Sequence, residues 1–269
     1  MGKTAFIGSG SMARAIIGGL VRHGVPGGDI LVVNPRNPKS TGEVQAMYGA
    51  VPSAPEAIRE ADTVVIAVKP QSFPEAAPVY RDFIAPGTLV VTIMAGIGTA
   101  AVEAAFPQAR VVRVMPNIAM SVGCGASGVA PGKTATDADV EKVVGIFACG
   151  GVAVKIDESE IDDVAALSGS GAAYIYLLTE ALRDAAIEDG MAPEKAAMLA
   201  RGGAAAGGRG RPARGAPSAH HLQKGHHRGR DKGNVRARPP RSRKSRLPGQ
   251  QGAFERAGRG QMSLRRRRR

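Results

Sequence analysis

The sequence has little cysteine and no long apolar run. Only two cysteines occur among its 269 residues, Cys124 and Cys149, which are too few for a disulfide framework or a zinc cluster. We expect both to be small buried residues of a reduced, cytoplasmic protein. Because no run of about 18 apolar residues occurs, we expect neither a membrane span nor a signal peptide.

Acidic and apolar residues are scarce in the last part of the chain. Residues 1–201 contain 16 Lys or Arg and 21 Asp or Glu, whereas residues 202–269 contain 20 and 2. Only six of the last 68 residues are Leu, Ile, Val, Phe, Met or Tyr, too few to offset the entropy lost on ordering the chain. The formal net charge of +13 therefore hides two parts: a mildly acidic globular part and a basic tail that we expect to be disordered.

Short β-branched runs alternate with helix-like segments through the globular part. Strands are predicted at residues 5–7, 30–33, 63–68, 89–93 and 110–115, and a helix between Met12 and Val21. Unbroken apolar strands of this kind are typical of a parallel sheet covered by helices on both faces. The alternation predicts an α/β doubly wound fold.

The first predicted strand leads into a glycine-rich turn with the pattern G-x-G-x-x-A, residues 8–13. Gly8 permits the tight turn, Gly10 lets a pyrophosphate approach the backbone, and Ala13 keeps the helix close to the sheet. The following helix would direct its N-terminus at the phosphates. A structural turn is the alternative interpretation, but the position between strand and helix favours a Rossmann-type dinucleotide site.

The end of the second predicted strand bears on which dinucleotide binds. A site for NAD would place an acidic residue there, yet this chain has NPRNPKS at 34–40, with no acid and two cations. Arg36 suits a 2′-phosphate because its guanidinium offers a planar fork of donors, and Asn34 supplies an amide beside it. We therefore expect NADPH as the cofactor, with NADH possible; a solvated basic turn is the alternative.

Further motifs follow the later strands: AVKPQ at 67–71, MAGI at 94–97, RVMPN at 113–117 and ALSGSGAAY at 166–174. With the glycine turn, their order and spacing resemble pyrroline-5-carboxylate reductase across residues 3–201. The resemblance implies NADPH-dependent reduction of 1-pyrroline-5-carboxylate to L-proline, in a cytoplasmic homo-oligomer.

The resemblance also implies where the ligands bind. It places the cofactor at two loops and one nicotinamide-side turn, namely Ile7, Gly8, Ser9, Gly10, Ser11 and Met12, then Ala67, Val68, Lys69 and Pro70, then Ala95 and Gly96. Glu158 would lie near the substrate, or be a solvated charge before a helix. No catalytic proton donor and no metal site is assigned.

The resemblance divides the chain into three parts. Residues 1–150 would form the NADP-binding Rossmann domain and residues 151–201 the start of a truncated, all-helical domain for dimerisation and substrate binding. A long helix is predicted over 174–190, with Pro193 in the first turn of the next. The sequence departs from the family at Ala172, where proline is usual, and at Ala54, where many members have asparagine.

Residues 202–269 would be the basic low-complexity tail, in place of the family's S-x-x-G-T-T segment for the substrate carboxylate. Reading codons for residues 222–231 from their second base permits Ser-(Lys/Arg)-(Lys/Arg)-Gly-Thr-Thr-Glu-Ala-Gly. We therefore expect a frameshift between about Arg201 and Leu222, which the degenerate code permits without forcing. The chain as written would then lack activity.

Two other functions stay open from the sequence. Another NADP-dependent imine or 3-hydroxyacid reductase would share the architecture, although Lys195 does not lie in the motif of a catalytic lysine. Alternatively, the tail is a nucleic-acid-binding arm, whose cations would bind phosphate without sequence preference. The tail has a single aromatic residue, Phe254, which leaves little scope for base stacking.

Overall fold

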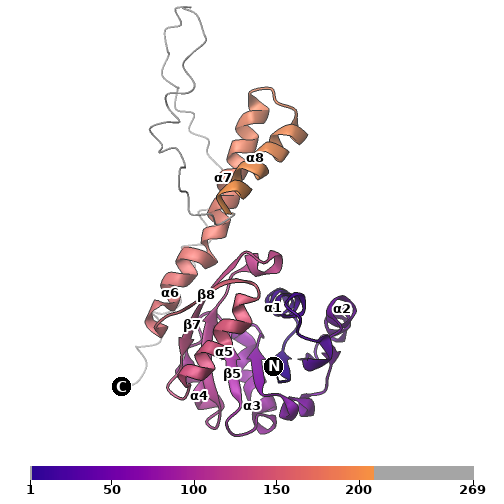
Figure 1. The fold of residues 1–269 in the computed structure, drawn as a ribbon, viewed down its shortest axis with the longest axis vertical. Coiled ribbons are helices and arrows are strands. Elements are labelled where there is room, and N and C mark those ends of the chain that lie inside the picture. Colours follow the sequence, from indigo (N-terminus) through magenta and orange to yellow (C-terminus); the bar gives the residue numbers. More distant parts are fainter. Residues whose placement is uncertain (1, 209–269) are drawn as a thin grey trace, which may run out of the picture. The chain divides into compact units, whose positions relative to one another are not determined.

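The computed structural model describes residues 2–208, which form a twisted sheet with helices on its two faces and a helical segment after it (Figure 1). The predicted tail, with its frameshift and nucleic-acid hypotheses, lies outside the described residues from position 209 onward. The strands are β1 (Thr4–Ile7), β2 (Ile30–Val33), β3 (Val51–Pro52), β4 (Thr63–Ile66), β5 (Leu89–Thr92), β6 (Arg110–Met115), β7 (Gly125–Pro131) and β8 (Gly151–Lys155). The α-helices are α1 (Ser11–Arg22), α2 (Pro38–Tyr48), α3 (Phe73–Tyr80), α4 (Thr99–Ala105), α5 (Asp137–Ala148), α6 (Ile161–Val164), α7 (Gly171–Glu188) and α8 (Pro193–Gly208).

The strand order is β3-β2-β1-β4-β5-β6-β7-β8. It confirms the α/β doubly wound class, since the order reverses at β1 and the first six strands run parallel. The sheet also contains an antiparallel pair, β6 with β7. Only a short segment with a 3-10 turn (Ile118–Val122) joins the two strands, and a parallel crossover needs a dozen or more residues.

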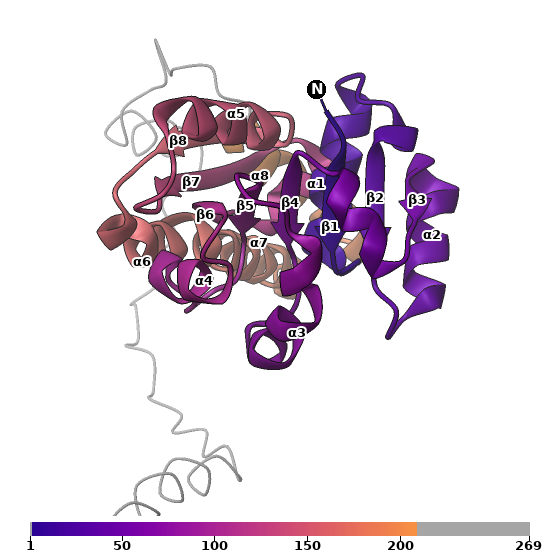
Figure 2. The ribbon, with the colours of Figure 1, turned by 90° about the horizontal axis from the view of Figure 1, so that it is seen from below.

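The alternating side chains of the strands form two cores, one on each face of the sheet. In β1, Phe6 packs with α1 and α5 on one face, while Ala5 and Ile7 pack with α3 and α4 on the other. Figure 2 shows the helices on both sides of the strands. Strands β1, β2, β4 and β5 are buried throughout, which explains why their sequences are unbroken apolar runs.

Two predicted strands end earlier than the sequence indicated. The strand expected over 63–68 ends at Ile66, and the one expected over 89–93 ends at Thr92. Ala67 still donates its backbone N–H to the Ile7 carbonyl at 2.9 Å, after which the chain turns out of the sheet. The apolar pattern continues beyond the two strands because Ala67, Val68 and Ile93 belong to the loops that follow them.

The sheet continues past residue 150, where the sequence placed the end of the first domain. Strand β8 pairs with β7 and belongs to the same sheet, so the sheet extends to Lys155. The helix expected over 174–190 is α7, and Pro193 is the first residue of α8, as predicted. Helix α8 runs to Gly208, past the point at 202 where the sequence placed the start of the tail.

Helices α7 and α8 pack against each other as a hairpin (Figure 1). None of the residues of α7 is buried, although the helix is rich in large apolar side chains. The exposed ones on the two helices are Tyr174, Ile175, Tyr176, Leu177, Leu178, Leu182, Met198 and Leu199. Among the described residues, no helix is both long enough and apolar enough to cross a membrane.

Candidate functional site

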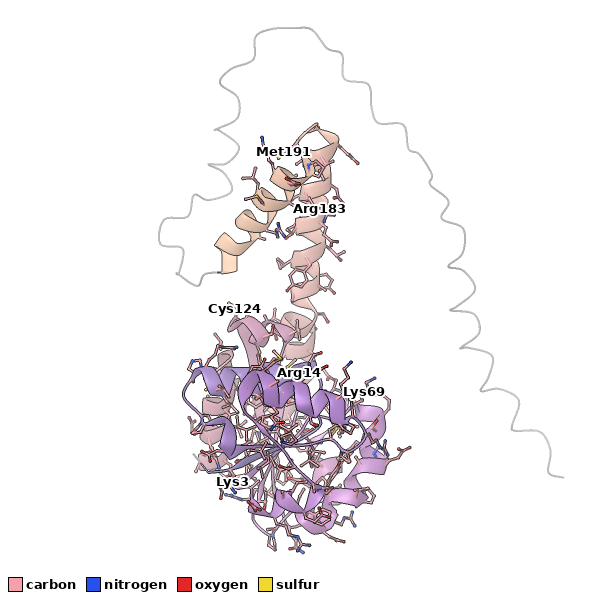
Figure 3. The ribbon with its side chains drawn as sticks, turned by 90° about the vertical axis from the view of Figure 1, so that its right-hand side faces the viewer. Lys3, Arg14, Lys69, Cys124, Arg183 and Met191 are labelled. Carbon is pink, nitrogen blue, oxygen red and sulfur yellow. The ribbon has the colours of Figure 1, made fainter. Side chains whose placement is uncertain are left out.

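A cleft lies where three parallel strands end at the same edge of the sheet. Strand β1 is flanked by β2 and β4 in matching register, so the turns after them converge. Figure 3 shows Lys69, which follows β4, at the opposite edge from Lys3, which precedes β1. The cleft has a volume of about 290 Å³ and is lined by Gly8, Ser9, Gly10, Val33, Asn34, Pro35, Arg36, Ala67, Val68, Lys69, Ser72, Ala76, Val79 and Tyr80.

The two glycines of the turn, Gly8 and Gly10, are required for different reasons. Gly8 has a φ of +110°, and a Cβ there would lie 2.6 Å from the carbonyl oxygen of Ala67, so only glycine fits. Gly10 precedes α1 with a φ of −71°, and a Cβ there would meet nothing within 4 Å. Its surroundings are open beside the N-terminus of α1, which has no acidic residue in its first turn. This end of the cleft therefore suits an anion bound by backbone N–H groups.

A hydrogen-bond network fixes the glycine turn to the end of β2 and to α2. The Ser9 hydroxyl donates to Ser40 Oγ at 2.8 Å and accepts from Asn34 Nδ2 at 2.8 Å. Arg14 donates to the Ser9 carbonyl at 3.1 Å, to Ser40 Oγ at 2.8 Å and to Glu43 at 2.6 Å. Ser9 and Ser40 are both buried, so these partners satisfy polar groups that would otherwise be costly to bury.

At the mouth of the cleft, Arg36 forms an ion pair that is exposed to solvent. Arg36 pairs with Glu75 at 3.3 Å, and both side chains are about 70% exposed. Exposed pairs of this kind contribute little, so Arg36 can exchange Glu75 for an anionic ligand. Tyr80 forms the wall beside it. Burial raises the pKa of the Tyr80 phenol, and the nearby Arg36 charge opposes this, so the phenol stays a neutral hydrogen-bonding group.

The next loop along the edge follows β5. Ala95 and Gly96 form a turn in which Gly96 has a φ of +74°, and the loop ends at Thr99, the first residue of α4. There Glu158 accepts from Thr99 N at 2.7 Å and from the Thr99 hydroxyl at 2.5 Å. Arg113 lies 3.2 Å from the same carboxylate. Partial burial acts to raise the pKa of Glu158, but the bonds from Thr99 and Arg113 outweigh it and lower the pKa.

Two family models match the chain. One, described as NADP oxidoreductase coenzyme F420-dependent, matches residues 3–96. The other, described as pyrroline-5-carboxylate reductase dimerisation, matches residues 158–210. A pyrroline-5-carboxylate reductase of Methanosarcina acetivorans is 38% identical over 201 residues, which are 74% of each chain. The chain belongs to the pyrroline-5-carboxylate reductase family.

Solved structures of this reductase family show the same fold. The pyrroline-5-carboxylate reductase of Coxiella burnetii is 32% identical, with a TM-score of 0.71 over 76% of this chain and 77% of that one. The Plasmodium falciparum pyrroline carboxylate reductase, whose structure has NADP bound, is 26% identical, with a TM-score of 0.65 over 74% of each chain. The resemblance found in the sequence motifs is thereby confirmed.

The structure brings most of the predicted cofactor residues of this reductase together. Eight of them line the cleft, whereas Ile7 is buried in β1 and Ser11, Met12 and Pro70 begin the helical turns beside it. Ala95 and Gly96 lie in the separate loop after β5. Glu158 uses its carboxylate to hold protein groups. Whether each of these residues contacts a ligand stays a prediction.

The sequence missed one wall of the cleft and the network behind it. Ser72, Ala76, Val79 and Tyr80 belong to α3 and the turn before it. The helix that follows AVKPQ could have indicated them, since the first helix after a strand folds back over its end. Arg14 carries no such signal, because two of its three partners lie 26 and 29 residues away in α2.

We expect Gly8→Ala and Gly10→Ala to separate folding from dinucleotide binding. Alanine at position 8 combines a left-handed φ with a clash against Ala67, so it should lower the unfolding temperature. Alanine at position 10 fits its backbone and should leave that temperature unchanged, while its methyl group enters the phosphate space and weakens NADPH binding. Thermal unfolding and NADPH fluorescence titration measure the two effects. Equal unfolding temperatures for both variants would contradict the role of Gly8.

We also expect Glu158 to make stability depend on acid pH. Because its pKa is lower in the folded chain, its contribution is complete above the ordinary Glu value and is lost as pH falls through the folded pKa. The unfolding temperature of the native chain should therefore drop more steeply below about pH 4.5 than that of Glu158→Gln. Glu141→Gln, an exposed position of α5, serves as the control. Superimposable profiles for native chain and Glu158→Gln would refute the expectation.

Proposed function

We propose that this chain binds NADPH in the cleft and has the fold for reducing 1-pyrroline-5-carboxylate to L-proline, but lacks the segment that holds the substrate carboxylate. The observation that carries the proposal is the convergence of the glycine turn, the β2 end with Arg36 and the β4 end with Lys69 around one cleft. Family membership supplies the substrate, and the relative with NADP bound supports the cofactor.

The residues present fit such a cofactor. The open space at Gly10 and the N–H groups of α1 would hold the pyrophosphate. Arg36 would exchange its exposed pair with Glu75 for the adenosine 2′-phosphate, and Lys69 would add positive charge. When bound, NADPH supplies a hydride from C4 of its reduced nicotinamide.

The protein's own contribution is to bind and orient. The Ser9–Ser40–Arg14 network fixes the adenosine end of the cleft, and the loop with Ala95 and Gly96 would border the nicotinamide. Holding both reactants in a fixed relative position removes much of the entropic barrier to their reaction. The substrate would lie on the side of this loop where the dimerisation segment begins, at Glu158.

We further propose that α7 and α8 form part of a homodimer interface, which the altered sequence after Arg201 leaves incomplete. Residues 174–178 are consecutive and all more than half exposed, so apolar side chains point to several sides of α7. A helix that is apolar nearly all round is normally buried, and the dimerisation model matches this segment. Cys124 is exposed and Cys149 is half-buried, so the expectation that both are buried was wrong. Both are free thiols, which fits a reducing compartment such as the cytoplasm.

The first test concerns cofactor choice. Arg36→Ala should weaken NADPH binding by roughly 10- to 100-fold, since a charge-assisted hydrogen bond contributes about 1.5–3 kcal/mol. Binding of NADH, which lacks the 2′-phosphate, should hardly change. Arg59→Ala is a matched control, because Arg59 lines a separate hollow at residues 81–86 and 106–109. Equal losses for NADPH and NADH would remove Arg36 from the phosphate site.

The second test concerns the sequence after Arg201. The chain as written should bind NADPH but form proline poorly, because it lacks the family's S-x-x-G-T-T segment. A version with the reading frame restored after Arg201 should be an active oligomer. Proline formation and size-exclusion chromatography at equal protein concentration compare the two. Comparable turnover would contradict our assignment of the substrate-carboxylate site to the missing segment.

A further inference from the structure

The loop predicted to border the nicotinamide is anchored at both ends. At its start, Ile93 donates its backbone N–H to the Ile66 carbonyl, and Met94 donates to Thr92 Oγ1, both at 3.3 Å. Met94 is also buried. The turn at Ala95 and Gly96 follows, and Gly98 leads into α4. The position of the turn therefore depends on what holds the far end, at Gly98 and Thr99.

Glu158 holds the far end of this loop, at Thr99. A helix start usually receives a capping side chain from the residue before it, but here that residue is Gly98, which has none. The carboxylate of Glu158 takes this role from 59 positions further along the chain. It accepts the Thr99 backbone N–H on one oxygen and the Thr99 hydroxyl on the other.

Arg113 fixes the carboxylate in turn. Its side chain is 9% exposed and contacts Glu158 from β6. A buried guanidinium without an acidic partner is strongly unfavourable, so Arg113 and Glu158 keep each other in place. The result is a cluster that joins β6, the start of α4 and the 3-10 turn Glu158–Glu160.

Glu158 is also the first residue that the dimerisation model matches. The cluster thus connects the loop after β5 to the beginning of the dimerisation segment. Asn117 makes a second connection, because its side chain donates to the Ser168 carbonyl at 3.0 Å and accepts from Ala126 N at 3.1 Å. This second connection does not touch the loop after β5.

We infer that Glu158 is a positioning residue, which acts through Thr99 to set the loop at Ala95 and Gly96 against the nicotinamide, and that it is not a substrate ligand. The inference rests on the proposed function. Thr99 and Arg113 already fill three of the about four acceptor sites of the carboxylate, so its oxygens serve the protein and little capacity is left for a substrate. The adenosine end of the cleft lies on β1, β2 and β4 and is held by the Arg14 network, which does not depend on Glu158.

The positioning role can be tested by comparing NADPH with a ligand that contains its adenosine end alone. Glu158→Gln should weaken NADPH binding by about tenfold, the effect expected when one charged hydrogen-bond acceptor is lost. Adenosine 2′,5′-bisphosphate, which has the adenosine end without the nicotinamide, should bind within about twofold of the native value. The fluorescence of bound NADPH should also change, because its nicotinamide would meet a displaced loop.

Matched variants separate positioning from general stability. Thr99→Val removes the hydroxyl with little change in volume and should reproduce part of the NADPH loss, whereas Thr99→Ser keeps the hydroxyl and should not. Glu141→Gln, an exposed position of α5, should leave both ligands unaffected. If Glu158→Gln does not fold, the Thr99 pair decides the question in the same way.

Each outcome has a distinct meaning. If the native chain binds neither ligand, the proposed function is wrong. If the native chain binds NADPH and Glu158→Gln binds it equally well, the proposed function stands and the positioning role is overturned. Equal losses for NADPH and adenosine 2′,5′-bisphosphate would also overturn it, since Glu158 would then support the whole cleft.

Discussion

The close approach of the turn after β1 to the end of β4 is the constraint on which the cleft depends. Gly8 lies against the backbone of Ala67, where no side chain fits. This contact lets the chain leave β1 sharply and begin α1 directly above the strand ends. Without it, the N-terminus of α1, the Arg36 segment and the Lys69 segment would not face a common space.

From this contact the structure extends in two directions along the sheet edge. Towards β2, hydroxyl and guanidinium groups join Ser9 to Ser40 and Arg14. Towards β5, the loop after the strand is held by Glu158 and Arg113. The first set of contacts lies within the nucleotide-binding part of the chain, whereas the second reaches into the segment that the family uses for dimerisation. A single carboxylate, that of Glu158, thus connects the loop after β5 to the segment that the dimerisation model matches.

The sequence predicted those elements whose signals are local. Buried strands such as Ile30–Val33 and Arg110–Met115 were found with their bounds, and so was the glycine turn, because each depends on neighbouring residues. Strand β7 was missed, since Gly125 and Gly128 give it a weak strand propensity. Its position depends on distant partners: a Cβ on Gly128 would lie 2.7 Å from Ile156. The role of Glu158 was hidden for the same reason, because its partners lie 45 and 59 residues away.

The Ser9–Ser40–Arg14 network has a thermodynamic consequence. Its donors and acceptors are paired within the protein, so the protein's own hydrogen bonds hold the wall behind the glycine turn. A ligand that meets a rigid wall loses less of its binding free energy to ordering side chains. The adenosine half would therefore dock first on a preorganised surface. The nicotinamide half would follow as an intramolecular step, at an effective concentration set by the short pyrophosphate link.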